Sequence, residues 1–149
     1  MKELQTSAYA FQDDRTRLYS LGTFVSVLAK AEQTNGAFNL FDVICPVGFS
    51  TLLHIHYADD VAVFVLEGEL TFFWGDEKMK AKIGSYFFQP RGVPHGFRVE
   101  GSAPARILYM TFPAGFDKFV IEHSKPIGAS EMRISEAHYK IEVLGPLPE

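Results

Sequence analysis

The chain has 149 residues, of which 47% are hydrophobic and 21% charged, and it carries a formal net charge of −4. This length suits one globular domain, and the composition is too apolar for a disordered chain. The negative charge and the lack of any basic run argue against a nucleic-acid partner, because phosphate binding needs clustered Lys and Arg.

The single cysteine excludes an intrachain disulfide, and Cys45 lies in an apolar stretch where we expect a buried, unreactive thiol. The residues before Arg15 contain no apolar segment typical of a signal peptide, and no apolar run approaches the length of a membrane span. We therefore expect a cytoplasmic protein with no membrane partner.

From Thr23 to Arg106 the chain alternates between short apolar runs and turn residues, which predicts the strands of a β-sandwich or barrel. Several runs are apolar on both faces, and residues 61–66 form one of them. Such strands need cover on both sides: the barrel interior on one, and the terminal segments or a second subunit on the other. The outer face around Phe64 and Leu66 predicts a homodimer.

After Pro113 the pattern changes to helical spacing, with a helix expected from Ala114 to Lys125 that Pro126 ends. A second short helix is expected over roughly residues 131–139. We therefore predict a single domain over 1–149, with a barrel at about 20–113 and a C-terminal helical appendix at about 114–142.

His54 and His56 are two residues apart in a predicted strand, so both side chains point to the same face. If that face is buried, the ring nitrogens need partners, and one metal ion would satisfy a nitrogen of each ring. A solvated strand that carries two surface histidines remains the alternative.

A second segment contains Pro90, Gly92 and His95, and it predicts a tight turn that delivers a histidine to the start of a new strand. Alone, this segment is equally compatible with a loop histidine next to a proline turn.

Together the two segments resemble the two sequence motifs of the cupin superfamily. The first motif is a glycine, five residues, H-x-H, a short spacer, a glutamate, six residues and a glycine; the second is a glycine, five residues, P-x-G, two residues and a histidine. The matching positions here are Gly48, His54, His56 and Gly68 in the first motif, and Gly84, Pro90, Gly92 and His95 in the second. Residues 64–70, 111–116 and 145–149 further resemble a subgroup often described as quercetin-2,3-dioxygenase-like.

The resemblance implies an all-β fold, an antiparallel cupin β-barrel (a double-stranded β-helix or jelly roll) with a metal ion inside, near one end. It implies that His54, His56 and His95 are the metal ligands. Imidazole ligands do not select the metal, so one divalent ion of iron, nickel, manganese or zinc is expected.

The fourth ligand of the family, a glutamate, would lie seven residues before Gly68, where this chain has Val61. Strand alternation points the adjacent Asp60 outward unless a bulge turns it inward, so Asp59 and Asp60 are interpreted as solvated turn residues. The substitution leaves either a three-histidine site with a higher net charge and open coordination positions, or a site that no longer binds metal.

The function favoured by this pattern is a metal-dependent dioxygenase that acts on a small enolisable or phenolic molecule. Val61, Tyr57, Tyr109 and Phe97 are candidates for lining the substrate pocket, and the two tyrosines for hydrogen bonding. No residue is assigned as catalytic. Two alternatives remain open: a module that binds a small ligand without turnover, and a metal-dependent isomerase or hydrolase in which the ion acts as a Lewis acid.

Overall fold

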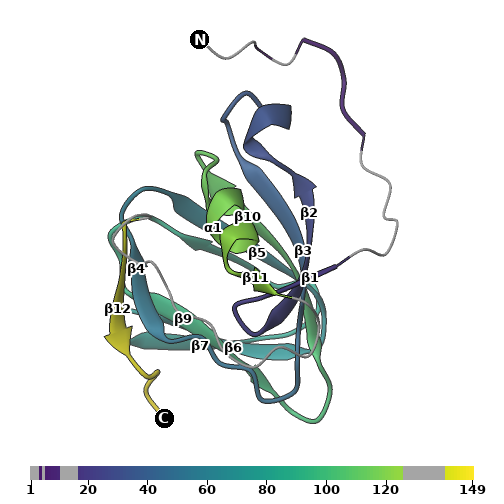
Figure 1. Cartoon of the computed structure of the whole chain (residues 1–149). Helices are drawn as coiled ribbons and strands as arrows, with labels where there is room; N and C mark the ends of the chain where they lie inside the picture. The colour runs from purple at the N-terminus through teal and green to yellow at the C-terminus, as the bar shows by residue number, and fades with distance from the viewer. Residues whose placement is uncertain (1–3, 5, 11–16, 126–139) are drawn as a thin grey trace.

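A computed structural model describes residues 4, 6–10, 17–125 and 140–149. In these residues the strands form two antiparallel sheets that face each other around a common interior (Figure 1). In spatial order, the first sheet contains β11 (Ser124–Lys125), β1 (Leu18–Ser20), β2 (Thr23–Ala29), β3 (Asn39–Cys45), β10 (Ala105–Phe112), β5 (Asp60–Glu67) and β8 (Tyr86–Gln89). The second contains β12 (Ile141–Gly145), β4 (Leu53–His56), β9 (His95–Glu100), β6 (Glu69–Trp74) and β7 (Glu77–Ala81).

Two short helices complete the described part of the fold: the 3-10 turn η1 (Ala31–Gln33) and the helix α1 (Phe116–Glu122). The expected all-β barrel with a short C-terminal helix is confirmed. None of the described helices is long and apolar enough to cross a membrane.

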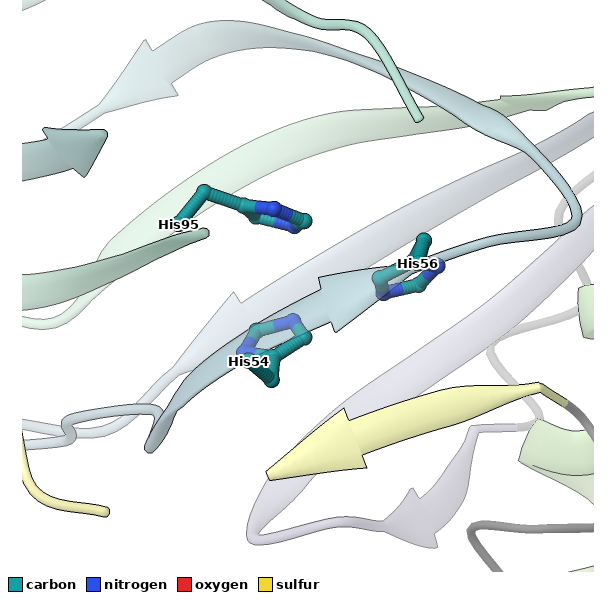
Figure 2. A group of neighbouring side chains, drawn as sticks. All are labelled: His54, His56 and His95. Carbon is teal, nitrogen blue, oxygen red and sulfur yellow. The ribbon is translucent and has the colours of Figure 1, made fainter. Parts of the chain in front are cut away.

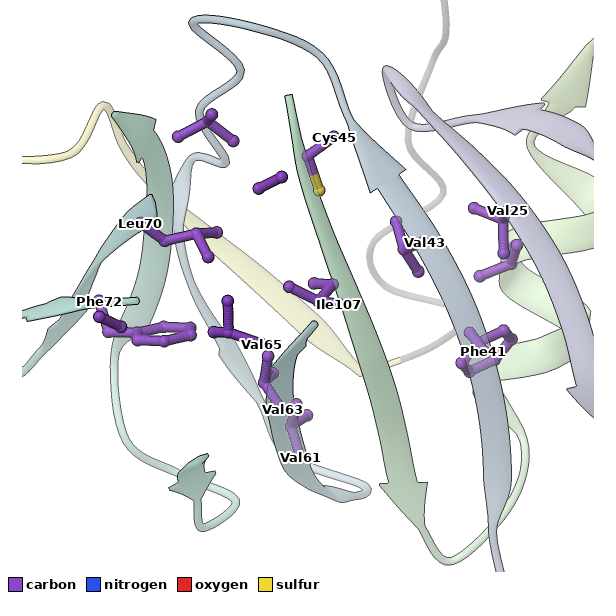
Figure 3. Close-up of a cluster of buried hydrophobic side chains, with 14 residues drawn as sticks. Val25, Phe41, Val43, Cys45, Val61, Val63, Val65, Leu70, Phe72 and Ile107 are labelled. Atoms are coloured by element: carbon purple, nitrogen blue, oxygen red, sulfur yellow. The ribbon is translucent and has the colours of Figure 1, made fainter. Parts of the chain in front are cut away.

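The core lies between the two sheets, and β5 shows how the sequence builds it. Val61, Val63 and Val65 are each at most 2% exposed and point into the interior, where they belong to the main apolar cluster (Figure 3). Phe64 points outward and is 37% exposed. This period of two confirms the expected inner face of the strand. Cys45 is fully buried in the same cluster, and burial raises the pKa of its thiol to about 12, as expected for an unreactive cysteine.

The helix expected over residues 114–125 is present but shorter, because Ser124 and Lys125 pair with β1 as strand β11. The second expected helix, over residues 131–139, lies outside the described residues. The helical appendix was expected to reach about residue 142, and this bound is wrong. Ile141 and Glu142 belong to β12, whose backbone pairs with β4. Cross-strand pairing therefore decides the conformation of this segment, and nothing in its own sequence predicted that partner.

Candidate metal centre

Three histidines from two neighbouring strands lie together at one place inside the barrel. His54 and His56 project from β4, and His95, the first residue of β9, pairs directly with His54. The ring centroids are 4.4 Å apart for His54 and His95, 5.1 Å for His54 and His56, and 5.2 Å for His56 and His95. One ring nitrogen of each residue lies within 4.8 Å of the others (Figure 2).

Backbone contacts hold the two ligand-bearing segments against each other. The N–H of Gly92 donates to the carbonyl oxygen of His56 at 2.8 Å, and Gly92 has a φ of +83°, which glycine adopts without strain. Directly after His95, a Cβ on Gly96 would lie only 2.6 Å from the Thr51 hydroxyl and 2.6 Å from the Leu147 side chain. The glycine of the P-x-G turn and the glycine behind His95 therefore permit the close approach of β9 to β4.

Each histidine is held through its Nδ1 atom. Nδ1 of His54 lies 2.6 Å from the carbonyl oxygen of Leu52, and Nδ1 of His95 lies 3.0 Å from that of Val93. A carbonyl oxygen can only accept, so in both rings Nδ1 carries the proton and Nε2 keeps a free lone pair. Nε2 of His95 is buried and has no hydrogen-bond partner. An orphaned acceptor beside two further imidazoles fits a bound cation, and the three histidines therefore fit the expected metal ligands.

Asp59 is a further member of this centre. Asp59 was expected to be a solvated turn residue, and this expectation is wrong. Asp59 is only 8% exposed, and its Oδ1 lies 2.8 Å from Nδ1 of His56. A carboxylate that holds the outer nitrogen of a metal-binding histidine fixes the ring orientation and raises the basicity of the other nitrogen.

Burial keeps two of the rings uncharged. Burial, together with repulsion from the neighbouring rings, lowers the pKa of His54 to about 4 and that of His95 to about 3. At neutral pH these two imidazoles are therefore neutral, which is the form that binds a metal ion.

The histidines open into a cavity of about 430 Å³ whose lining is mostly apolar. Its aromatic lining residues are Tyr19, Phe41, Phe49, Phe72, Phe87, Phe97, Tyr109, Phe116 and Phe119. This volume falls in the range of small-molecule sites. A ligand in this cavity would be in contact with aromatic rings.

Three of the four predicted pocket residues line this cavity: Val61, Phe97 and Tyr109. Tyr57 does not. It is 50% exposed, and its hydroxyl donates to the Glu142 carboxylate at 2.8 Å. Tyr57 follows His56 directly, and strand alternation sends its side chain to the opposite face, so the period of two could have excluded it.

At the position of the missing glutamate, Val61 faces the cavity and Asp60 does not. The pairing of β5 with β10 continues in regular register through both residues, so no bulge turns Asp60 inward. Asp60 forms an ion pair with Arg91, at 3.2 Å between Oδ1 and Nε. The expected outward orientation of Asp60 is confirmed.

Sequence reasoning missed a second polar residue, Gln89 at the end of β8. It is 3% exposed and lines the cavity, and its Oε1 atom has no hydrogen-bond partner. The signal that could have found it is its position two residues after Phe87 in one strand, which puts both side chains on the same face.

Comparison with known proteins agrees with this architecture. Residues 41–111 match the family model described as "Cupin domain". An uncharacterised protein of Methanocaldococcus jannaschii is 35% identical over 75 residues, which cover 50% of this chain and 60% of that protein. The chain thus matches less than two thirds of the length of this relative.

Two solved structures superpose over most of the barrel. KdgF from Halomonas sp. has a TM-score of 0.66 at 17% identity, covering 75% of this chain and 99% of that one. An RmlC-like cupin from Shewanella frigidimarina has a TM-score of 0.64 at 19% identity, covering 75% of this chain and 96% of that one. At these identities the likeness shows the fold alone.

Proposed function

We propose that this chain, whose residues 41–111 match the Cupin domain model, is a metal-dependent oxidoreductase whose His54, His56 and His95 hold one divalent ion through Nε2. The observation that carries the proposal is the tethering of all three Nδ1 atoms to acceptors, which leaves three inward Nε2 atoms as donors. Such preorganisation is expected of a ligand set.

Different residues of the chain would have different roles around this ion. The ion, when bound, supplies Lewis-acid and redox chemistry. His54, His56 and His95 would position it, Asp59 would orient His56, and the aromatic lining would pack against a bound substrate. Burial and the nearby Asp59 raise the pKa of Tyr109, so its hydroxyl stays protonated and can donate a hydrogen bond to a substrate oxygen.

We propose a small enolisable or phenolic substrate, as in a quercetin-2,3-dioxygenase-like reaction with O₂. The aromatic lining suits a planar, mostly apolar molecule, and three protein ligands leave coordination positions open for a substrate oxygen. Among the described residues, the cavity lining contains no Asp, Glu, Lys or Cys. Apart from the three histidines, an isomerase or hydrolase would therefore have only Tyr19 and Tyr109 of the described lining as a general acid or base.

A binding module without turnover is the second candidate, and Val61 is the observation that favours it. The apolar side chain faces the cavity at the place of the family's carboxylate ligand. Loss of that ligand would weaken metal binding. In this case the cavity would hold a small ligand in the absence of catalysis.

Elemental analysis combined with oxygen uptake tests the proposal. Protein purified without chelator should contain iron or another redox-active divalent ion and should consume O₂ with at least one member of a panel of phenols and enolisable ketones. Zinc or nickel without oxygen uptake would instead support an isomerase or hydrolase. Absence of any bound metal would overturn the enzyme proposal and support the binding module.

We further propose a single domain over 1–149 that forms a homodimer. Phe64, Tyr86 and Phe88 lie next to each other on β5 and the edge strand β8, and they are 37%, 58% and 48% exposed. An apolar group of this kind at a sheet edge favours association with a second copy of the chain. Leu66, which was expected to share this surface, is half-buried.

A further inference from the structure

Gln89 is a buried polar side chain without an assigned role. It is 3% exposed, it lines the same cavity as the three histidines, and its Oε1 atom has no hydrogen-bond partner. Buried amide oxygens in native proteins nearly always have a partner, because desolvation without compensation is unfavourable. An orphaned oxygen that lines a cavity therefore indicates a partner that occupies the cavity.

The sheet register places Gln89 beside the position of the missing ligand. Gln89 of β8 pairs directly with Val61 of β5. Directly paired residues project to the same side of a sheet, with Cβ atoms about 4.5–5.5 Å apart. The amide thus lies beside the side chain that replaces the family's glutamate.

The chain segment after Gln89 ties this residue to the metal centre. The N–H of Gly92, three residues later, donates to the carbonyl oxygen of His56 at 2.8 Å, and His95 follows within the same segment. The N–H of Arg91 donates to Asp60 Oδ1 at 2.8 Å, which anchors the same turn to the start of β5. The turn that follows Gln89 and leads to His95 is therefore tied both to His56 and to the start of β5.

We propose that the amide oxygen of Gln89 is the fourth protein donor to the metal ion, taking the place that Val61 leaves empty. The proposal rests on the proposed function, in which the three histidines hold an ion. An amide oxygen is a hard, neutral donor that suits ions such as Mn²⁺ and Fe²⁺. The donor set would then be three nitrogens and one oxygen with no charge of its own, and the nearby negative charge would come from Asp59 behind His56.

Replacing the Gln89 amide by an apolar side chain of similar size distinguishes a metal-binding role of this residue from a structural role. In the metal-free protein, Gln89→Leu removes an unpaired buried oxygen, so its melting temperature should equal or exceed that of the wild type. Its affinity for Co²⁺, measured by competition with a chromophoric chelator, should fall at least about tenfold. Phe87→Leu is the matched control: it changes the same face of β8 and removes no donor, so it should lower the melting temperature and leave Co²⁺ affinity within about twofold.

A second variant keeps the test decisive if Gln89→Leu does not fold. Gln89→Glu retains the length of the side chain and adds a charge beside the ion, so Co²⁺ should bind more tightly than to the wild type. Co²⁺ affinity that is unchanged in both variants would overturn the fourth-donor role while the three-histidine site stands. A metal-free Gln89→Leu protein as destabilised as Phe87→Leu would overturn it in favour of a structural role. A wild-type protein that binds no Co²⁺ would refute the proposed function itself.

Discussion

The Asp59 carboxylate accepts a hydrogen bond from the His56 ring at 2.8 Å, and this contact can be tested with a neighbouring control. Asp59→Asn removes the negative charge behind a metal ligand, so affinity for a divalent ion should fall about 10–100-fold. Asp60→Asn changes the adjacent residue, which pairs with Arg91 away from the cavity, and it should leave the affinity unchanged. Isothermal titration of the metal-free variants measures both. Equal losses in the two variants would contradict the assignment of Asp59 to the centre.

The lowered pKa values of His54 and His95 predict how the metal-free protein responds to acid. The pKa is about 4 for His54 and about 3 for His95, and both lie below the ordinary value of 6.5. At pH values between these lowered pKa values and 6.5, the unfolded chain therefore binds more protons than the folded one. The free energy of unfolding should therefore be constant just above pH 6.5 and should decrease as the pH falls from 6.5 toward 4. Urea titrations across this range provide the measurement. The free energy of unfolding of the wild type should depend on pH in this range, and that dependence should weaken in a His54→Asn/His95→Asn variant. A wild type without this pH dependence, or a variant that keeps it in full, would contradict neutral buried rings.

Within single strands, the sequence pattern predicted which side chains share a face, because side chains alternate between the two faces of a strand. The inner face of β5, the shared face of His54 and His56, and the outward position of Asp60 all follow from the period of two. The cluster of His95 with the other histidines needed the motif resemblance, because nothing local relates residue 95 to residue 54. The pairing of β12 with β4 was missed because it is a tertiary contact that local sequence does not encode. The bond from His56 to Asp59 spans only three residues, and it was missed because the alternation pattern does not specify the conformation of the turn after β4.

The register of β5 gives a prediction about Val61, which faces the cavity. Val61→Glu places a carboxyl group in the buried site, which should lower the melting temperature of the metal-free protein. Next to a divalent ion the carboxyl group ionises and becomes a ligand, so added metal should stabilise this variant more than the wild type. Thermal melts with and without the ion decide the matter. Equal stabilisation of the two proteins would show that Val61 does not face the metal.

For the whole molecule, the exposed aromatic residues on β5 and β8 predict a homodimer in solution. Sedimentation at micromolar concentration should give twice the mass of the 16.7 kDa chain. A Phe64→Glu/Phe88→Glu variant should sediment as a monomer, because it introduces like charges into the apolar surface. Its metal affinity should be unchanged, since both residues point away from the cavity. A wild-type protein that is monomeric at this concentration would contradict the prediction.

We propose that three histidines from β4 and β9 hold one divalent ion inside the barrel. Anomalous diffraction from crystals of protein purified without chelator can locate this ion. We predict one anomalous peak at about 2.0–2.2 Å from Nε2 of His54, His56 and His95. We also predict that a His54→Ala/His56→Ala variant loses both the peak and the bound metal. A metal-containing protein with its anomalous peak elsewhere, or a double variant that retains its full metal content, would contradict the account.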